Sequence, residues 1–178
     1  RDGQNAARLR RGLMDVLMYL GRYDEAVKMG KGSLTYFRRH GLKSDEAKVL
    51  TNLGNVYHRM DRNRLALSYY DKARKLFETE GGVPLAVVAY NQANIYTNLN
   101  DLERAEVLYN SAARIYKQHR MDIACCQAEY SLAYIYFLRD RYADALNLLE
   151  RVNESFARLG DRRSAATVAL DLVELNNK

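Results

Sequence analysis

The sequence predicts an all-α fold built as a stack of antiparallel helix pairs, with about four and a half copies of one repeat. Three observations predict it. The alanines Ala26, Ala66, Ala105 and Ala145 each follow a polar break and stand 40, 39 and 40 residues apart. A small residue and an aromatic residue precede three of them, at fixed distances of twelve and nine positions. Apolar residues between these anchors recur every three or four positions, which is helical periodicity.

The first helix of each predicted pair is one pattern written three times, at 52–57, 91–96 and 131–136. Its small residues are Gly54, Ala93 and Ala133, and its aromatic residues are Tyr57, Tyr96 and Tyr136. Small residues let two helices approach to about 8–10 Å, while Tyr and Leu fill the space beside them. The pattern therefore predicts where the two helices of a pair cross.

The second helix of each pair follows a short polar break whose Gly, Asn or Asp residues supply turn chemistry. These breaks stand at 21–22, 61–63, 100–101 and 140–141, and the second helices then run through 66–77, 105–116 and 145–156. Each following unit begins after Gly or Pro signals at 41, 81–84 and 160–161. The predicted repeats are 7–46, 47–85, 86–125 and 126–165, with a partial fifth at 166–178.

Composition narrows the class of protein. Of 178 residues, 48% are hydrophobic and 28% are charged, with one Pro and no Trp, which is typical of a soluble, helix-rich chain. Charge interrupts every apolar run and no signal segment is visible, so we expect a cytoplasmic protein without a membrane span.

The neighbouring Cys125 and Cys126 diverge on a helix and are expected to be packed and unreactive. Because the chain starts at Arg1 and its repeat pattern stops at Lys178, we expect a segment of a longer protein.

The spacing of small, aromatic and Ala positions resembles the tetratricopeptide repeat. The residues that match it in full are Gly54, Tyr57, Ala66, Tyr70 and Ala73, and Ala93, Tyr96, Ala105, Tyr109 and Ala112 match almost as well. The period exceeds the usual length of about 34 residues. It is similar to long-helix repeats of kinesin light chains, spindle-orientation adaptors, bacterial peptide-sensing regulators and bacterial proteins that join such arrays to caspase-like (CHAT) peptidase domains. The resemblance implies a right-handed α-solenoid that binds a protein or peptide, and it favours a bacterial multidomain regulator as the parent.

In this family the first helices line a concave groove, so the resemblance implies a set of groove residues. They are Arg11, Lys48, Thr51, Asn52, Asn55, Arg59, Tyr90, Asn91, Asn94, Asn98, Tyr130 and Tyr134. An amide both donates and accepts hydrogen bonds, so Asn52, Asn55, Asn91 and Asn94 are expected to hold the backbone of an extended peptide. The tyrosines would add flat contacts, while Arg8, Arg11, Lys48 and Arg59 would favour acidic groups.

Two alternatives apply to the asparagines and to the groove. The asparagines could instead bridge neighbouring helices, since Asn is often kept for local hydrogen bonds. The family subtype that grips a ligand's C-terminal carboxylates needs cations that the corresponding run, from Thr51 through Asn55 and Asn91 to Ser131, does not contain. No carboxylate clamp of that kind is expected.

Other classes of function have less support. The sequence offers no nucleophile–base pair, metal-ligand spacing or phosphate loop, so we expect no catalysis, no metal and no cofactor. The net charge of +6 and the many tyrosines would suit nucleic acid, but the Arg residues are scattered, so nucleic-acid binding is not expected. The rival interpretation is a structural spacer or self-association region: residues 167–175 keep an apolar face without a partner helix, and a homodimer could form through that terminal helix.

Overall fold

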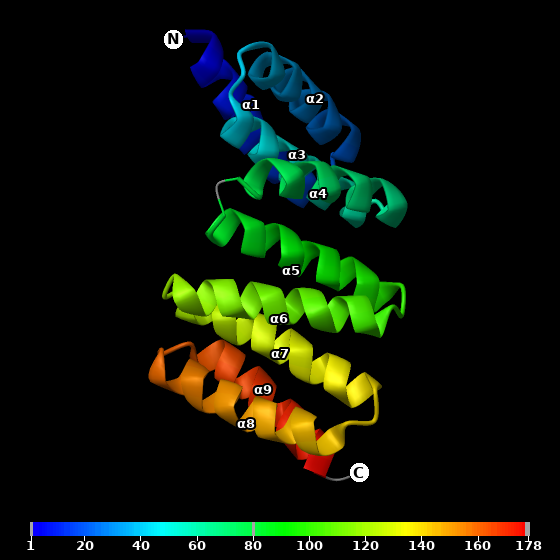
Figure 1. The fold of residues 1–178 in the computed structure, drawn as a ribbon, viewed down its shortest axis with the longest axis vertical. Helices are drawn as coiled ribbons and strands as arrows, with labels where there is room; N and C mark the ends of the chain where they lie inside the picture. The colour runs from blue at the N-terminus through cyan, green and yellow to red at the C-terminus, as the bar shows by residue number, and fades with distance from the viewer. Residues whose placement is uncertain (1, 80, 177–178) are drawn as a thin grey trace. The chain divides into compact units, whose positions relative to one another are not determined.

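A computed structural model describes residues 2–79 and 81–176, with the side chain of the last of these excepted. Within this part of the chain there are nine α-helices and no β-strand, which confirms the predicted all-α repeat fold (Figure 1). The helices are α1 (Asp2–Tyr19), α2 (Tyr23–Arg39), α3 (Lys43–Arg59), α4 (Asn63–Phe77), α5 (Val83–Asn98), α6 (Leu102–Gln118), α7 (Asp122–Leu138), α8 (Tyr142–Arg158) and α9 (Arg162–Asn176).

Seven of the breaks between helices share one backbone device. Each places one residue at a positive φ between 54° and 76°: Gly21, Gly41, Asp61, Asn100, Arg120, Asp140 and Gly160. The residue after it donates its N–H back across the helix end, as from Arg62 to the Tyr57 carbonyl at 2.9 Å. This is the Schellman closure, which satisfies carbonyls that the helix leaves unpaired.

The first helices begin three to five residues before the predicted repeat starts. Observed starts at residues 2, 43, 83, 122 and 162 compare with predicted starts at 7, 47, 86, 126 and 166. The closure at Arg120 explains one of these offsets, because an Arg at positive φ carries none of the Gly, Asn or Asp signal that marks the other breaks. Residues 177–178 of the predicted fifth repeat lie outside the described residues.

The chain divides into two compact units, Arg1–Asn91 and Gln92–Lys178, and α5 contributes to both. In the first unit, α1 packs on α2, α3 packs on α4, and α1 also contacts α3. The predicted crossing at Gly54 is tight: a Cβ added there would lie 2.4 Å from Cε1 of Tyr70, a side chain that is 1% exposed. The aromatic ring therefore lies directly on the glycine backbone.

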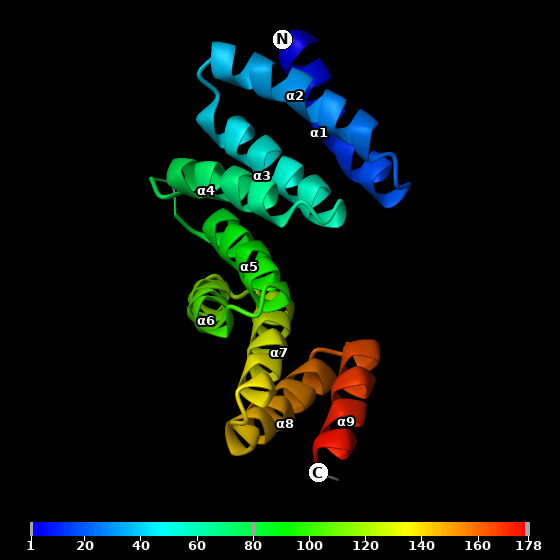
Figure 2. The same cartoon turned by 90° about the vertical axis from the view of Figure 1, so that its right-hand side faces the viewer.

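In the second unit, α6 packs on α7, α7 on α8, and α8 on α9; Figure 2 shows α8 and α9 as neighbours. The small residues predicted at its helix crossings are fully buried: Ala93, Ala105, Ala112, Ala133 and Ala145. On α9, Val168 and Leu175 are buried, whereas Leu170 and Val173 are 67% and 60% exposed. The apolar face predicted on this helix is thus accessible, and a homodimer formed through it stays a prediction.

None of the helices in the described ranges has the length and apolarity required to cross a membrane.

Candidate functional site on the first helices

The predicted asparagines of the first unit are hydrogen-bonded to one another and to neighbouring helices. Asn55 on α3 accepts a hydrogen bond from the Tyr70 hydroxyl of α4 at 2.6 Å and another from Nδ2 of Asn91 on α5 at 3.0 Å. Asn52 donates from Nδ2 to Asp15 of α1 at 3.1 Å. Part of their hydrogen-bonding capacity therefore goes to bridging helices, as the alternative interpretation expects.

The second unit repeats one of these contacts. The Tyr109 hydroxyl of α6 donates to Oδ1 of Asn94 on α5 at 2.6 Å, the same distance as from Tyr70 to Asn55. In both cases Asn stands one position after the small residue and Tyr stands sixteen after it. We call Tyr70–Asn55 and Tyr109–Asn94 the Tyr–Asn bridges.

Each Tyr–Asn bridge orients its amide. Burial raises the pKa of Tyr70, so its hydroxyl stays protonated and acts as a donor at neutral pH. In both bridges the Asn carbonyl oxygen faces the tyrosine hydroxyl, so the amide NH2 group lies on the other side. Within the described residues, Nδ2 of Asn55 and Nδ2 of Asn94 donate to no partner, and both side chains are half-buried. The NH2 groups of Asn55 and Asn94 are therefore donors of the predicted ladder that make no hydrogen bond within the described residues.

The cations expected to attract acidic groups differ in availability. Arg8 and Arg11 of α1 both bind the carboxylate of Asp45 on α3, with N–O distances of 2.8 Å and 3.2 Å. Lys48 and Arg59 are exposed and form no ion pair with any described residue. The expectation of an acidic ligand therefore rests, in the first unit, on Lys48 and Arg59.

The other predicted groove residues vary in exposure. Thr51 does not face outward: it is 7% exposed and its hydroxyl donates to the Ala47 carbonyl one turn earlier, at 3.0 Å. Its place directly before Asn52 gave no indication that it is buried. Tyr90 is half-buried and Asn98 is exposed.

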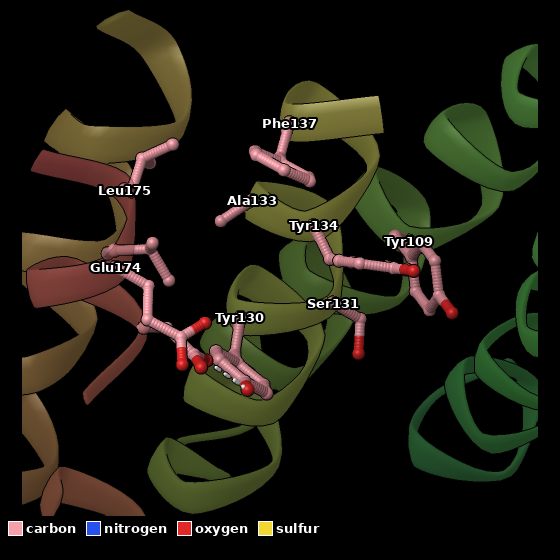
Figure 3. A pocket seen from close by; sticks show the side chains of 10 residues that line it. Tyr109, Tyr130, Ser131, Ala133, Tyr134, Phe137, Glu174 and Leu175 are labelled. Atoms are coloured by element: carbon pink, nitrogen blue, oxygen red, sulfur yellow. Dashed lines mark hydrogen bonds between the residues drawn. The ribbon is translucent and has the colours of Figure 1, made fainter. Parts of the chain in front are cut away.

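The last two predicted residues, Tyr130 and Tyr134 of α7, line a cavity of about 410 Å³ in the second unit. Figure 3 shows aromatic side chains of α7 on one side of it and Glu174 and Leu175 of α9 on the other. Its aromatic and acidic lining residues are Tyr109, Tyr130, Tyr134, Phe137, Asp171 and Glu174. We call this space the acidic–aromatic cavity.

Hydrogen bonding and stacking organise the acidic–aromatic cavity. The Tyr130 hydroxyl donates to Oδ2 of Asp171 at 2.5 Å, marked by the dashed line in Figure 3. Burial, together with this hydrogen bond, raises the pKa of Tyr130 to about 12, so the hydroxyl is protonated at neutral pH. Tyr134 is 53% exposed and stacks on Phe137, with ring centroids 6.4 Å apart and an interplanar angle of 19°. The cavity thus presents ordered rings and carboxylates.

Sequence reasoning missed Asp171 and Glu174. Ser131 and Tyr134 stand two positions before and one after the small residue Ala133, and Asp171 and Glu174 follow them by 40 residues. The same period that located the asparagines therefore assigns both acids to groove positions. They were overlooked because the fifth repeat was interpreted only as an exposed apolar face.

No reactive site emerges among the cysteines or acids that the structure describes. Burial raises the pKa of the Cys125 thiol to about 11, and burial also raises that of Cys126, so both favour the unreactive thiol form. In the described ranges, no three His, Cys, Asp or Glu side chains are grouped so as to hold a metal ion.

Comparison with known proteins defines the relationships of the chain. The Arabidopsis thaliana protein kinesin light chain-related 2 is 24% identical over 160 residues, covering 85% of this chain and 24% of that protein. Response regulator aspartate phosphatase J of Bacillus subtilis is 31% identical over 113 residues, covering 64% of this chain and 29% of that protein. The chain thus spans about a quarter of the length of these relatives.

A solved structure of a Rap protein complexed with competence and sporulation factor has the same fold. The TM-score is 0.69 at 17% identity, and the match covers 98% of this chain and 64% of that one. The model of the tetratricopeptide repeat family matches residues 5–79 and 45–118, which together span more than half of the sequence. The chain therefore belongs to the tetratricopeptide repeat family, whose arrays serve as protein-interaction modules.

Proposed function

We propose that this chain is a non-catalytic interaction module that binds an extended polypeptide segment along the exposed faces of its first helices. One observation carries the proposal: in each Tyr–Asn bridge the amide oxygen accepts a hydrogen bond, while the amide N–H groups donate to no described residue. A peptide backbone offers carbonyl oxygens regardless of its sequence, so oriented N–H donors suit an extended segment.

The bridges support binding more than mere helix linkage. A hydroxyl–carbonyl contact alone would join the two helices with any acceptor, including a side chain without N–H groups. Asn also has poor helix propensity, yet Asn55 and Asn94 stand inside α3 and α5. The bridge to tyrosine alone does not explain why Asn stands at these positions. The N–H donors of the Asn side chain do explain it, if they bind a ligand.

The relatives are consistent with this function. One is named for kinesin light chains, and a Rap protein of the same fold has been solved with competence and sporulation factor bound. The phosphatase activity in the name of the Bacillus subtilis relative belongs to a protein of which this chain matches 29%. We propose binding, and not that activity, for this chain.

The test is selection from a displayed library of random dodecapeptides, followed by titration of synthetic, end-capped versions of the enriched peptides. The test variant is Asn55→Asp/Asn94→Asp, in which the new carboxylate still accepts from tyrosine but no longer donates to a peptide carbonyl. Each lost hydrogen bond is worth about 0.5–1.5 kcal/mol, and carboxylate–carbonyl repulsion adds to it, so we expect affinity to fall about tenfold or more.

Asn147→Asp/Asn153→Asp is the matched control, because it makes the same charge change on the second helix α8. Peptides that bind the wild type and the control, but bind the test variant weakly, support the proposal. If no peptide is enriched, or if the test variant binds as well as the control, the proposal is overturned. If the chain binds no peptide but self-associates, and Leu170→Glu/Val173→Glu abolishes the self-association, the result would instead support the spacer interpretation.

A further inference from the structure

We propose that the acidic–aromatic cavity of the second unit receives a basic side chain, Arg or Lys, of the bound polypeptide. This inference rests on the proposed function and deepens it, because it names the chemistry of one ligand residue. It stands on three features of the cavity: carboxylates without a counter-charge among the described residues, aromatic side chains, and apolar side chains.

The carboxylates of the cavity lack a counter-charge within the described residues. Asp171 and Glu174 form no ion pair with any Lys or Arg there, although the sequence carries a net charge of +6. A contrasting case lies in the same unit, where Glu106 of α6 binds Arg139 at 2.6 Å and Arg141 at 2.9 Å. An acid at an interhelical position can therefore pair with an arginine of the chain, whereas Asp171 and Glu174 form no such pair among the described residues.

The orientation of Asp171 leaves it ready for a cation. The Tyr130 hydroxyl donates to Oδ2 of Asp171 and so holds that carboxylate, while Oδ1 accepts no hydrogen bond from any other described residue. Glu174 stands on the next turn of α9, lines the same cavity and is exposed. A guanidinium or ammonium group would meet the carboxylate of Asp171, held by Tyr130, and that of Glu174, and charge-assisted hydrogen bonds of this kind are the strong ones.

The aromatic walls favour the same ligand. A cation is attracted to the face of a Tyr or Phe ring, and the interaction strengthens when water is excluded. Tyr134 and Phe137 of α7 stack on each other and both line the cavity, and Tyr134 extends toward Tyr109 in Figure 3. This arrangement suits a positive group placed between rings and carboxylates.

The apolar residues that line the cavity suit the aliphatic part of the side chain. Ala133, Leu149 and Leu175 contribute apolar surface, and Arg and Lys bury their methylene stems on such surface while their charged heads stay at polar groups. The volume of about 410 Å³ lies within the range of about 300–1,000 Å³ that is typical of ligand sites. One long side chain fits this description.

Tyr109 connects the cavity with the peptide-binding donors. Its side chain lines the cavity, and its hydroxyl holds Asn94 at 2.6 Å. A segment whose backbone is held by Asn94 can therefore place a side chain toward the cavity. This link favours a residue of a polypeptide as the occupant over a free amine.

The experiment combines a protein variant with a ligand variant. Asp171→Asn/Glu174→Gln removes both charges at nearly constant shape, and replacing the ligand's arginine with citrulline removes its charge likewise. The probes are the selected, end-capped dodecapeptides. We expect the protein variant to bind the arginine peptide at least tenfold more weakly and the citrulline peptide as the wild type does, so that the two changes are not additive. The difference in affinity between the wild type and the protein variant for the arginine peptide should shrink as ionic strength rises.

Glu150→Gln/Glu154→Gln is the matched control, since it removes two exposed charges from α8. Urea unfolding of every variant verifies that the fold is kept. The inference is overturned if the selected peptides contain no basic residue, if citrulline is accepted as well as arginine, or if the protein variant binds as the control does. It is also overturned if tetramethylammonium ion alone displaces the peptide at concentrations at which guanidinium and methylammonium ions do not.

The outcomes separate this inference from the proposed function. Loss of binding in Asn55→Asp/Asn94→Asp together with normal binding in Asp171→Asn/Glu174→Gln keeps the proposed function and refutes the cavity. Failure to enrich any peptide refutes both.

Discussion

The second and fourth repeats use the same positions for different purposes. In the second repeat, the ring of Tyr70 covers Gly54 and its hydroxyl completes the bridge to Asn55. This helix crossing is filled: Tyr70 is 1% exposed, and its side-chain hydroxyl is hydrogen-bonded. The side chain therefore serves packing and amide orientation together.

In the fourth repeat, Leu149 stands at the position of that tyrosine, sixteen residues after Ala133. Leucine is shorter and has no hydroxyl, so it cannot bridge to the residue after Ala133, which is Tyr134. Tyr134 turns outward to 53% exposure, and the acidic–aromatic cavity lies beside it. One change at a packing position thus accompanies the change from a filled crossing to a cavity.

The largest expected effect comes from breaking the closed crossing of the second repeat. Gly54→Leu places a side chain where even a Cβ would lie 2.4 Å from the buried Tyr70 ring. Overpacking of this kind costs about 1–3 kcal/mol, so we expect the free energy of unfolding in urea to fall by that amount. Gly12→Ala is the control: a Cβ there meets no atom within 4 Å, and helix propensity predicts a gain of about 0.5–1 kcal/mol. Equal stability of both variants would show that the Gly54 crossing is not tight.

The next effect would come from giving the fourth repeat the residues of the second. Tyr134→Asn/Leu149→Tyr should fill the cavity with the new ring and let its hydroxyl bond to the new amide, as Tyr109 does beside Ala93. We expect affinity for an arginine-containing selected peptide to fall about tenfold, because a cation–π partner and the space for the side chain are both removed. Fluorescence anisotropy measures this. Unchanged affinity would show that Leu149 does not create the binding space.

The repeat pattern and most helix ends could be predicted because local signals determine them. Gly, Asn and Asp mark six of the seven Schellman breaks, and small residues mark the crossings. Arg120 adopts the same positive φ without such a signal. At that break the same backbone hydrogen bond closes the helix, from Met121 to the Tyr116 carbonyl at 2.9 Å, without a residue type that favours positive φ.

The site was predictable only in part, because its chemistry arises from pairs on different helices. The positions of Asn55 and Asn94 followed from the family, but their tyrosine partners required a comparison of residues fifteen apart. The pairing of Arg8 and Arg11 with Asp45 depends on how α1 packs against α3, which no local pattern specifies. Residue type alone therefore overstated the positive charge open to a ligand.

The smallest expected effect concerns the pH dependence contributed by Tyr130. Its pKa is raised to about 12 in the folded chain, against about 10 for an unperturbed tyrosine. Between these values the unfolded chain releases a proton that the folded chain keeps, so this contribution to stability is complete below pH 10 and is lost as pH rises toward 12. In urea unfolding, the stability difference between wild type and Tyr130→Phe should therefore shrink over this interval.

Tyr70, whose pKa is also raised, is present in both proteins and cancels from the difference. The effect is small because the Tyr130 side chain is partly exposed and water screens its interaction with Asp171. A difference that stays constant from pH 9 to pH 12 would mean that Tyr130 ionises equally in both states, and the hydrogen bond that orients Asp171 would then contribute nothing to the cavity.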